Sequence, residues 1–293
     1  FLNFRLRLYI FRFAFYALRD TRYDSRDTNF VLRYSTKVRN IKLILEYDGT
    51  SYCGWQIQPK VPTVQGCLEK SLSCIFKQEI KTVVAGRTDA GVHATGQVVS
   101  FTIENRVSLS AIKPAVNSCL PENIRVKKVK EVDLDFHAQR SALSRAYRYI
   151  IYNDSFLPPF YSHFVQQISF PLRIEKMKYA SDFLLGEHNF SSFQSQGSPT
   201  FSSWRRIDKI SFICQKKFLI IYIKANSFLY KMTRNIVGTL VEIGREKIPC
   251  SQMKIILEAR DRRIAGPTAP PQGLYLVRVS YEKDSVERLA DSV

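Results

Sequence analysis

Two short apolar runs enclose a glycine-rich loop in the first third of the chain, and this stretch restricts the possible folds most. The first run ends at residues 83–84 and the second begins at residues 98–101. Valine-rich runs of this kind predict buried strands. The loop contains three glycines spaced five residues apart, Gly86, Gly91 and Gly96. Because glycine permits backbone paths that side chains forbid, we expect a tightly shaped loop between two strands.

The same loop carries one acidic residue, Asp89, near Arg87, Thr88, His93 and Gln97. A carboxylate held between two apolar strands loses part of its hydration and needs a cationic or amide partner. Asp89 could instead be a turn residue whose side chain bonds its own backbone, which is a common use of Asp in glycine-rich loops. The loop residues alone leave both interpretations open.

The rest of the chain alternates between strand-like and helix-like patterns. Apolar alternation and runs of β-branched or aromatic residues predict strands at residues 41–47, 146–152, 206–214, 218–225 and 274–281. Helical spacing predicts helices at residues 64–76, 110–119, 174–185, 229–243 and 251–260. These patterns predict an α+β protein with two similar domains, each a mainly antiparallel sheet with helices on one face and a cleft between the domains.

We place the two domains at residues 41–143 and 144–284, with an N-terminal extension at 1–40 and a tail at 285–293. Several local features of the two domains are also predicted. Thr63 in the first domain caps its helix, and Gly186 ends the helix at 174–185. Residues 188–193 form a loop, and Asn226 or Ser227 caps the following helix.

The net charge of the chain is unusually positive, since 44 Lys and Arg stand against 26 Asp and Glu for a balance of +18. Nine basic and three acidic residues lie in residues 1–40, so the remainder keeps +12. An excess of this size favours a polyanionic partner, with nucleic acid ahead of a membrane surface. A solvated basic surface without a partner is the alternative.

No apolar run reaches the ~18 residues of a transmembrane helix, so we expect no membrane partner. The apolar part of residues 1–40 is interrupted by Arg12, which disfavours a signal peptide. We expect this extension to be poorly ordered, with organellar targeting as a minor alternative. The six cysteines form no Cys-x-x-Cys pair and do not group with the four histidines, which argues against a zinc site and for reduced thiols.

Residues 86–94 closely resemble the signature of the TruA family of tRNA pseudouridine synthases. The resemblance covers most of residues 41–281, and four further blocks lie in the family's order at 44–56, 136–149, 225–238 and 265–276. It implies an isomerase that converts uridine to pseudouridine in the anticodon stem-loop, at positions 38–40 of tRNA. It also implies that the predicted cleft is catalytic and that no cofactor or metal takes part.

The resemblance also places functional residues on this sequence. It implies that Asp89 is the catalytic carboxylate, that Arg234 from the second half is its cationic partner, and that Tyr147 is the active-site tyrosine. The residues expected to contact substrate or order the loop are Arg87, Thr88, His93, Gln97, Tyr149 and Arg205. Arg87 would fill the stack when the target base leaves it, or would form an ion pair with Asp89. Gln139 departs from the family, which has Arg at this position.

By the same resemblance, we expect a cytoplasmic homodimer in which one tRNA spans both subunits. Two alternatives remain at this stage. One is an enzyme of this fold with a different RNA target, and the other is an RNA-binding protein without catalysis.

Overall fold

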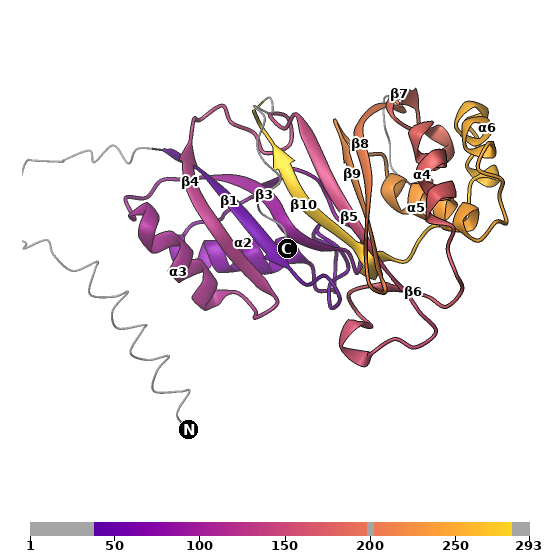
Figure 1. Ribbon diagram of the computed structural model, residues 1–293. Helices are drawn as coiled ribbons and strands as arrows, with labels where there is room; N and C mark the ends of the chain where they lie inside the picture. The colour runs from indigo at the N-terminus through magenta and orange to yellow at the C-terminus, as the bar shows by residue number, and fades with distance from the viewer. Residues whose placement is uncertain (1–37, 198–201, 283–293) are drawn as a thin grey trace, which may run out of the picture.

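The computed structural model describes residues 38–197 and 202–282 (Figure 1). Within them, ten strands form one sheet in the order β4-β1-β3-β10-β5-β9-β8-β7, with β2 beside β3 and β6 beside β5. The strands of the first half are β1 (Arg39–Tyr47), β2 (Val83–Val84), β3 (His93–Ile103) and β4 (Ile124–Val132). Those of the second half are β5 (Ser144–Asn153), β6 (Gln166–Ile168), β7 (Gly186–Asn189), β8 (Trp204–Gln215), β9 (Phe218–Ala225) and β10 (Leu274–Ser280).

Five α-helices within the described residues accompany the sheet: α2 (Val64–Phe76), α3 (Leu109–Cys119), α4 (Ile174–Asp182), α5 (Met232–Gly244) and α6 (Gln252–Ala259). The Thr63 side chain caps α2 by accepting a hydrogen bond from the main-chain N–H of Gly66, as the sequence predicts. Figure 1 shows α2 and α3 against the first half of the sheet and α4, α5 and α6 against the second half.

β10 joins the two halves, although it is the last strand of the described residues. It lies parallel to β3 of the first half and antiparallel to β5 of the second half. Gly96 of β3 permits this close approach, since a Cβ atom there would lie 2.2 Å from the carbonyl oxygen of Val277. The two predicted sheets are therefore continuous through one hydrogen-bonded strand.

The register across this junction decides which side chains share a face of the sheet. Tyr47 of β1 is opposite Ala94 of β3, which is opposite Leu276 of β10. Leu276 is in turn opposite Tyr147 of β5. Because directly opposed residues point to the same side of a sheet, Tyr47 and Tyr147 share one face although 100 residues separate them. Both tyrosines are buried, and this face holds the candidate site described below.

The α+β class and the large, mainly antiparallel sheet with helices are confirmed. The domain boundary near residue 143 stays a prediction. The predicted tail and residues 1–37 of the predicted extension lie outside the described residues. None of the helices in the described parts of the chain is long and apolar enough to cross a membrane.

Some local predictions are wrong. The helix predicted at 174–185 ends at Asp182, because the chain turns to pair residues 186–189 with β8. Gly186 consequently begins β7, with φ of +94°, instead of ending the helix. Residues 188–189 belong to this strand and not to a loop.

The predicted cap of α5 is also wrong. The side chain of Asn226 accepts hydrogen bonds from the main-chain N–H groups of Arg206 and Ser227, so it fixes the end of β9. The helix begins only at Met232, after Lys231 in a left-handed conformation with φ of 58°.

Gly238 determines how closely α5 packs on the segment before β10. A Cβ atom on Gly238 would lie only 1.7 Å from the carbonyl oxygen of Pro267, which is main chain and cannot rotate away. We expect Gly238→Ala to reduce the free energy of unfolding by about 3 kcal/mol, measured by urea denaturation. Gly66→Ala is the control, because its Cβ would meet only side chains, and a change within about 1 kcal/mol is expected. Equal stability of the two variants would contradict this packing.

Candidate active site

A cavity of about 900 Å³ opens on the face that Tyr47 and Tyr147 share. One wall consists of residues 85–90 and the loop at 53–58 from the first half. The opposite wall consists of residues 227–234, which lead from β9 into α5 of the second half. The charged residues that line the whole cavity are four cations and one carboxylate: Arg87, Arg145, Lys231, Arg234 and Asp89. The cavity therefore favours an anionic ligand.

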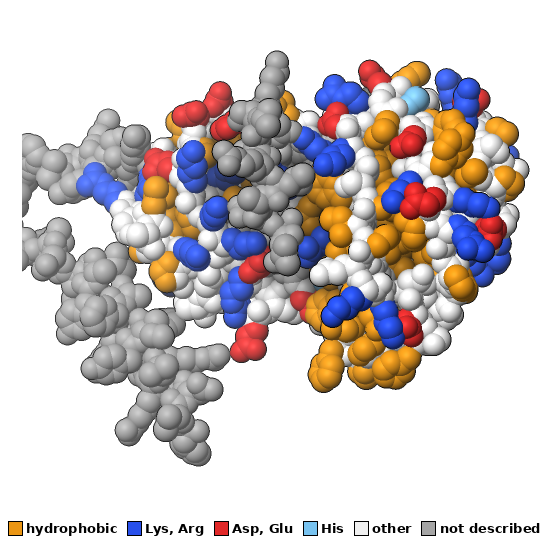
Figure 2. All heavy atoms as spheres, viewed as in Figure 1, with side chains coloured by type: hydrophobic (Ala, Val, Ile, Leu, Met, Phe, Trp, Pro, Cys, Tyr) orange, Lys and Arg blue, Asp and Glu red, His pale blue; other side chains and the backbone are white. Residues whose placement is uncertain are grey.

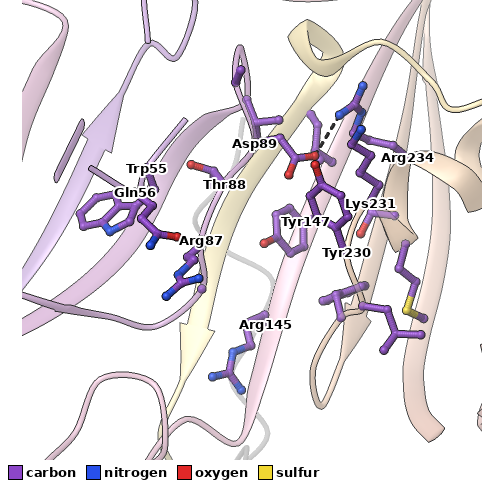
Figure 3. A pocket seen from close by; sticks show the side chains of 18 of the residues that line it. Trp55, Gln56, Arg87, Thr88, Asp89, Arg145, Tyr147, Tyr230, Lys231 and Arg234 are labelled. Carbon is purple, nitrogen blue, oxygen red and sulfur yellow. Dashed lines mark hydrogen bonds and ion pairs between the residues drawn. The ribbon is translucent and has the colours of Figure 1, made fainter. Parts of the chain in front are cut away.

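Asp89 and Arg234 form an ion pair across this cavity, with 2.9 Å between the guanidinium Nη1 and the carboxylate Oδ2 (Figure 3). The two side chains are 22% and 12% exposed, so the pair is partly desolvated and the carboxylate still reaches the cavity. A guanidinium at this distance donates a charge-assisted hydrogen bond, which orients the carboxylate.

Arg234 is held in place by the segment before β10. Its Nε donates to the carbonyl oxygen of Ala269 at 2.7 Å, and the N–H of Ala269 donates back to the carbonyl of Arg234 at 3.1 Å. The guanidinium therefore keeps one nitrogen on the backbone and presents another to Asp89. This arrangement fixes the direction of the ion pair.

Buried polar side chains of β1 and β3 hold the loop of Asp89 in place. The hydroxyls of Thr88 and Tyr47 are 2.8 Å apart, and the amide of Gln97 donates to the carbonyl of Gly86 at 2.8 Å. Gly91 has φ of +74°, a conformation that favours glycine, so it turns the chain after Asp89. Thr88 and Gln97 are 7% and 0% exposed, so in this structure they order the loop.

Tyr147 forms the floor of the cavity between the two walls. It is 8% exposed, lines the cavity, and packs edge-on against Phe228 with ring centroids 5.0 Å apart. Burial raises the pKa of its phenol well above the ordinary value, and nearby Tyr47 and Asp89 add to the effect. Tyr147 therefore stays uncharged. It can stack on a base or donate a hydrogen bond from its hydroxyl, but it does not act as a phenolate.

Arg145 connects the segments that surround the cavity. Its guanidinium donates hydrogen bonds to four main-chain carbonyls, those of Ala85, Gln139, Ala142 and Asn226. These carbonyls belong to the Asp89 loop, the segment before β5 and the connection from β9 to α5. One side chain on β5 thus sets the relative positions of both walls. Burial lowers the pKa of Arg145, which nevertheless remains charged at neutral pH.

Arg87 is exposed and points into the cavity region (Figure 3). It forms no ion pair with Asp89, and no hydrogen bond of its side chain is found within residues 38–197 and 202–282. Gln139 lines the cavity beside Arg145, with its carbonyl bound by that residue.

Four predicted substrate-contacting residues do not line the cavity: Gln97, which orders the Asp89 loop, and Tyr149, Arg205 and His93. Tyr149 is fully buried, with its hydroxyl 2.8 Å from the carbonyl of Pro270, and Arg205 lies on β8 opposite His188. His93 is also buried: its Nδ1 accepts from the N–H of Gly49 and its Nε2 lies 2.9 Å from the carbonyl of His163. Nδ1 also lies 3.2 Å from a carboxylate oxygen of Asp48, and burial lowers the pKa of His93 although Asp48 acts in the opposite direction.

Comparison with known proteins shows the family to which the chain belongs. A family model described as tRNA pseudouridine synthase matches residues 43–139 and 180–282. The tRNA pseudouridine synthase A of Buchnera aphidicola subsp. Acyrthosiphon pisum (strain Tuc7) is 46% identical over 244 residues, which cover 83% of this chain and 92% of that protein. The enzyme of the same name from Aliivibrio salmonicida (strain LFI1238) is 44% identical over 83% of this chain and 93% of its own length. The chain belongs to the tRNA pseudouridine synthase family.

The site of this family member also contains residues that the sequence did not single out. Tyr47 supports the Asp89 loop, Arg145 bridges both walls, and the Ala269 carbonyl holds Arg234. Arg145 stands inside a family block, but only the fold shows which carbonyls it reaches. Within the described residues, no group of three or more His, Cys, Asp or Glu could hold a metal ion.

We expect Arg145→Lys to reduce kcat by about 10²-fold while KM changes less than threefold, because one ammonium cannot bridge four carbonyls and the walls shift. Steady-state isomerisation kinetics measure both constants. Arg145→Ala should regain activity with added guanidinium and not with methylammonium. Arg125→Lys is the control, since among the described residues the side chain of Arg125 on β4 donates only to the nearby carbonyls of Pro121 and Ile124. Wild-type kinetics in Arg145→Lys would exclude this positioning role.

Proposed function

We propose that this protein isomerises uridine to pseudouridine in the anticodon stem-loop of tRNA, at positions 38–40, with Asp89 as the catalytic carboxylate. The observation that carries the proposal is the Asp89 to Arg234 ion pair, which stands open to a cavity lined by both halves of the chain. The relatives named tRNA pseudouridine synthase A support the reaction and the substrate class.

The reaction breaks the bond between N1 of uracil and C1′ of ribose and forms a bond from C5 to C1′. The hydrogen leaves C5 and a proton is bound at N1, so the product is an isomer of the substrate. Positive charge develops on the ribose as the first bond breaks, and a carboxylate beside C1′ stabilises this charge. Asp89 supplies that carboxylate, and the hydrogen bond from Arg234 orients it.

The remaining lining groups suit a base that has left its stem. Tyr147 offers an uncharged aromatic ring at the cavity floor, on which uracil can stack. Arg87 is the cavity cation that occupies the vacated position in the RNA stack. A uridine inside a helical stem must be flipped out before a carboxylate can reach its glycosidic bond.

The charge of the protein favours tRNA as the partner. The chain carries a balance of +18, and Figure 2 shows Lys and Arg side chains on the viewed surface of both halves. Such a distribution attracts the phosphate backbone over an area larger than one cavity. As parts of the same proposal, the protein acts as a homodimer in which one tRNA spans both subunits, and it works in the cytoplasm.

We expect Asp89→Asn to reduce isomerisation by at least about 10³-fold, because a neutral amide cannot stabilise charge at C1′. Binding of an anticodon stem-loop RNA should stay within several-fold of wild type. Carbodiimide labelling followed by primer extension detects the product and maps the modified uridines.

Asp208→Asn is the matched control for this experiment. Asp208 also pairs with an arginine, Arg206, at 2.7 Å, but it lies on β8 and outside the cavity lining. Its substitution should leave turnover unchanged. Retained turnover in Asp89→Asn would show that Asp89 is not the catalytic carboxylate. Labelling at uridines of another RNA would show that the substrate is that RNA. If the protein without substitutions gave no labelled product, only the RNA-binding alternative would remain.

A further inference from the structure

We infer that the start of α5 is a phosphate-binding subsite, at which Lys231, Thr233 and two free main-chain N–H groups hold a phosphodiester flanking the target uridine. The inference rests on the proposed function, because it names a part of the RNA that the cavity holds. Its basis is a set of unused donors on the second-half wall, next to the Asp89 to Arg234 pair.

Thr233 is the first observation that points to a ligand. It is 5% exposed and lines the cavity, and its hydroxyl makes no hydrogen bond within residues 38–197 and 202–282. The Thr233 hydroxyl is not among the fully buried unpartnered side-chain atoms, so although the residue is buried its oxygen stays accessible from the cavity. A hydroxyl held in this way by a buried side chain can donate a hydrogen bond to a ligand oxygen in the cavity.

The backbone of α5 adds two donors beside this hydroxyl. In the described structure, the N–H of Met232 donates to Leu229 and that of Asn235 to Lys231. No such bond is made by the N–H groups of Thr233 and Arg234, which lie between them in the first turn of this 13-residue helix. The first turn of a helix carries partial positive charge and binds phosphate oxygens through free N–H groups.

Lys231 supplies a full charge at the same place. It lines the cavity and forms no ion pair within the described residues, and its ammonium lies 5.0 Å from the ring centre of Tyr230. Figure 3 shows Lys231 and Arg234 at the same end of the cavity. Because Asp89 and Arg234 neutralise each other, the charge of Lys231 is not cancelled locally. An ammonium, a hydroxyl and helix N–H groups together match a phosphodiester and not a neutral base.

The subsite has a consequence for the reaction. A flipped uridine needs one fixed point besides its stacked base if its ribose is to stay beside a carboxylate. A phosphate held at the start of α5 provides that point, and the same helix carries Arg234. The position of the nucleotide and the direction of Asp89 are thus both set by α5.

The test is a double-mutant cycle between protein and RNA. Binding is measured by fluorescence anisotropy in an Asp89→Asn background, so that turnover does not change the RNA. The probes are anticodon stem-loops in which either phosphate flanking the target uridine is replaced by a neutral methylphosphonate. The protein variants are Lys231→Met and Thr233→Val, which remove the charge and the hydroxyl while keeping most of the side-chain shape.

At one of the two positions, we expect the methylphosphonate to weaken binding about tenfold with Lys231 present and less than twofold in Lys231→Met. Thr233→Val should weaken binding of native RNA several-fold and reduce the methylphosphonate effect in the same way. Lys231→Met should also lower the slope of log affinity against log salt concentration by about 0.7, the value for one phosphate of a single strand.

Lys216→Met and Thr102→Val are the controls. Lys216 has φ of 53°, close to that of Lys231, but it lies in the exposed turn between β8 and β9. Thr102 is an exposed threonine of β3. For both controls, the loss of binding free energy caused by the protein substitution and the loss caused by the methylphosphonate should be additive. Additive losses for Lys231→Met at both phosphates, with an unchanged salt slope, would overturn the subsite.

The failure of this inference can be separated from failure of the proposed function. Product formation by the protein without substitutions on native RNA is recorded beside the cycle. If the RNA is isomerised but the losses of binding free energy are additive, the subsite is rejected and the proposed function stands. Absence of isomerisation rejects the proposed function, whatever the binding data show.

Discussion

The ion pair between Asp89 and Arg234 is the interaction on which the site depends. Its two partners are 145 residues apart in sequence, and they belong to different halves of the chain. An exposed pair of this kind contributes little to stability, whereas a partly desolvated pair is sensitive to geometry because neither charge is fully hydrated. The structure meets this demand with fixed main-chain partners, since the backbone at Ala269 holds Arg234 and the buried contacts of Thr88 and Gln97 hold the Asp89 loop.

The position of β10 makes this pairing possible. Because β10 lies between β3 and β5, the segment before β10 that fixes Arg234 is joined to the strand that follows the Asp89 loop. Gly96 allows the close contact of β3 with β10, and Gly238 allows that of α5 with Pro267. The two halves consequently form one sheet, and Arg145 links the same walls a second time through four carbonyls. The relative positions of the cavity walls therefore follow from the topology of the sheet together with the Arg145 hydrogen bonds.

Periodicity in the sequence predicted most strands and helices, since buried residues such as those of β1 alternate clearly and Thr63 caps α2. It failed where long-range pairing decides local structure. Gly186 opens an edge strand because β8 offers a partner, and Asn226 bonds Arg206 instead of a helix N–H. The motif residues Asp89, Arg234 and Tyr147 do meet at one cavity, whereas Tyr149 and His93 are buried away from it. Which side chains of a strand face a cavity depends on register with distant strands, and no local pattern contains that register. The role of Arg145 could not be predicted for the same reason.

The most direct measurement is a crystal structure of the Asp89→Asn variant bound to an anticodon stem-loop RNA. The account predicts a uridine turned out of its stem into the cavity, with its base on Tyr147 and its ribose C1′ within about 3.5 Å of the side chain at position 89. A complex in which the uridine stays stacked in the stem, or in which the RNA binds with the cavity empty, would contradict it.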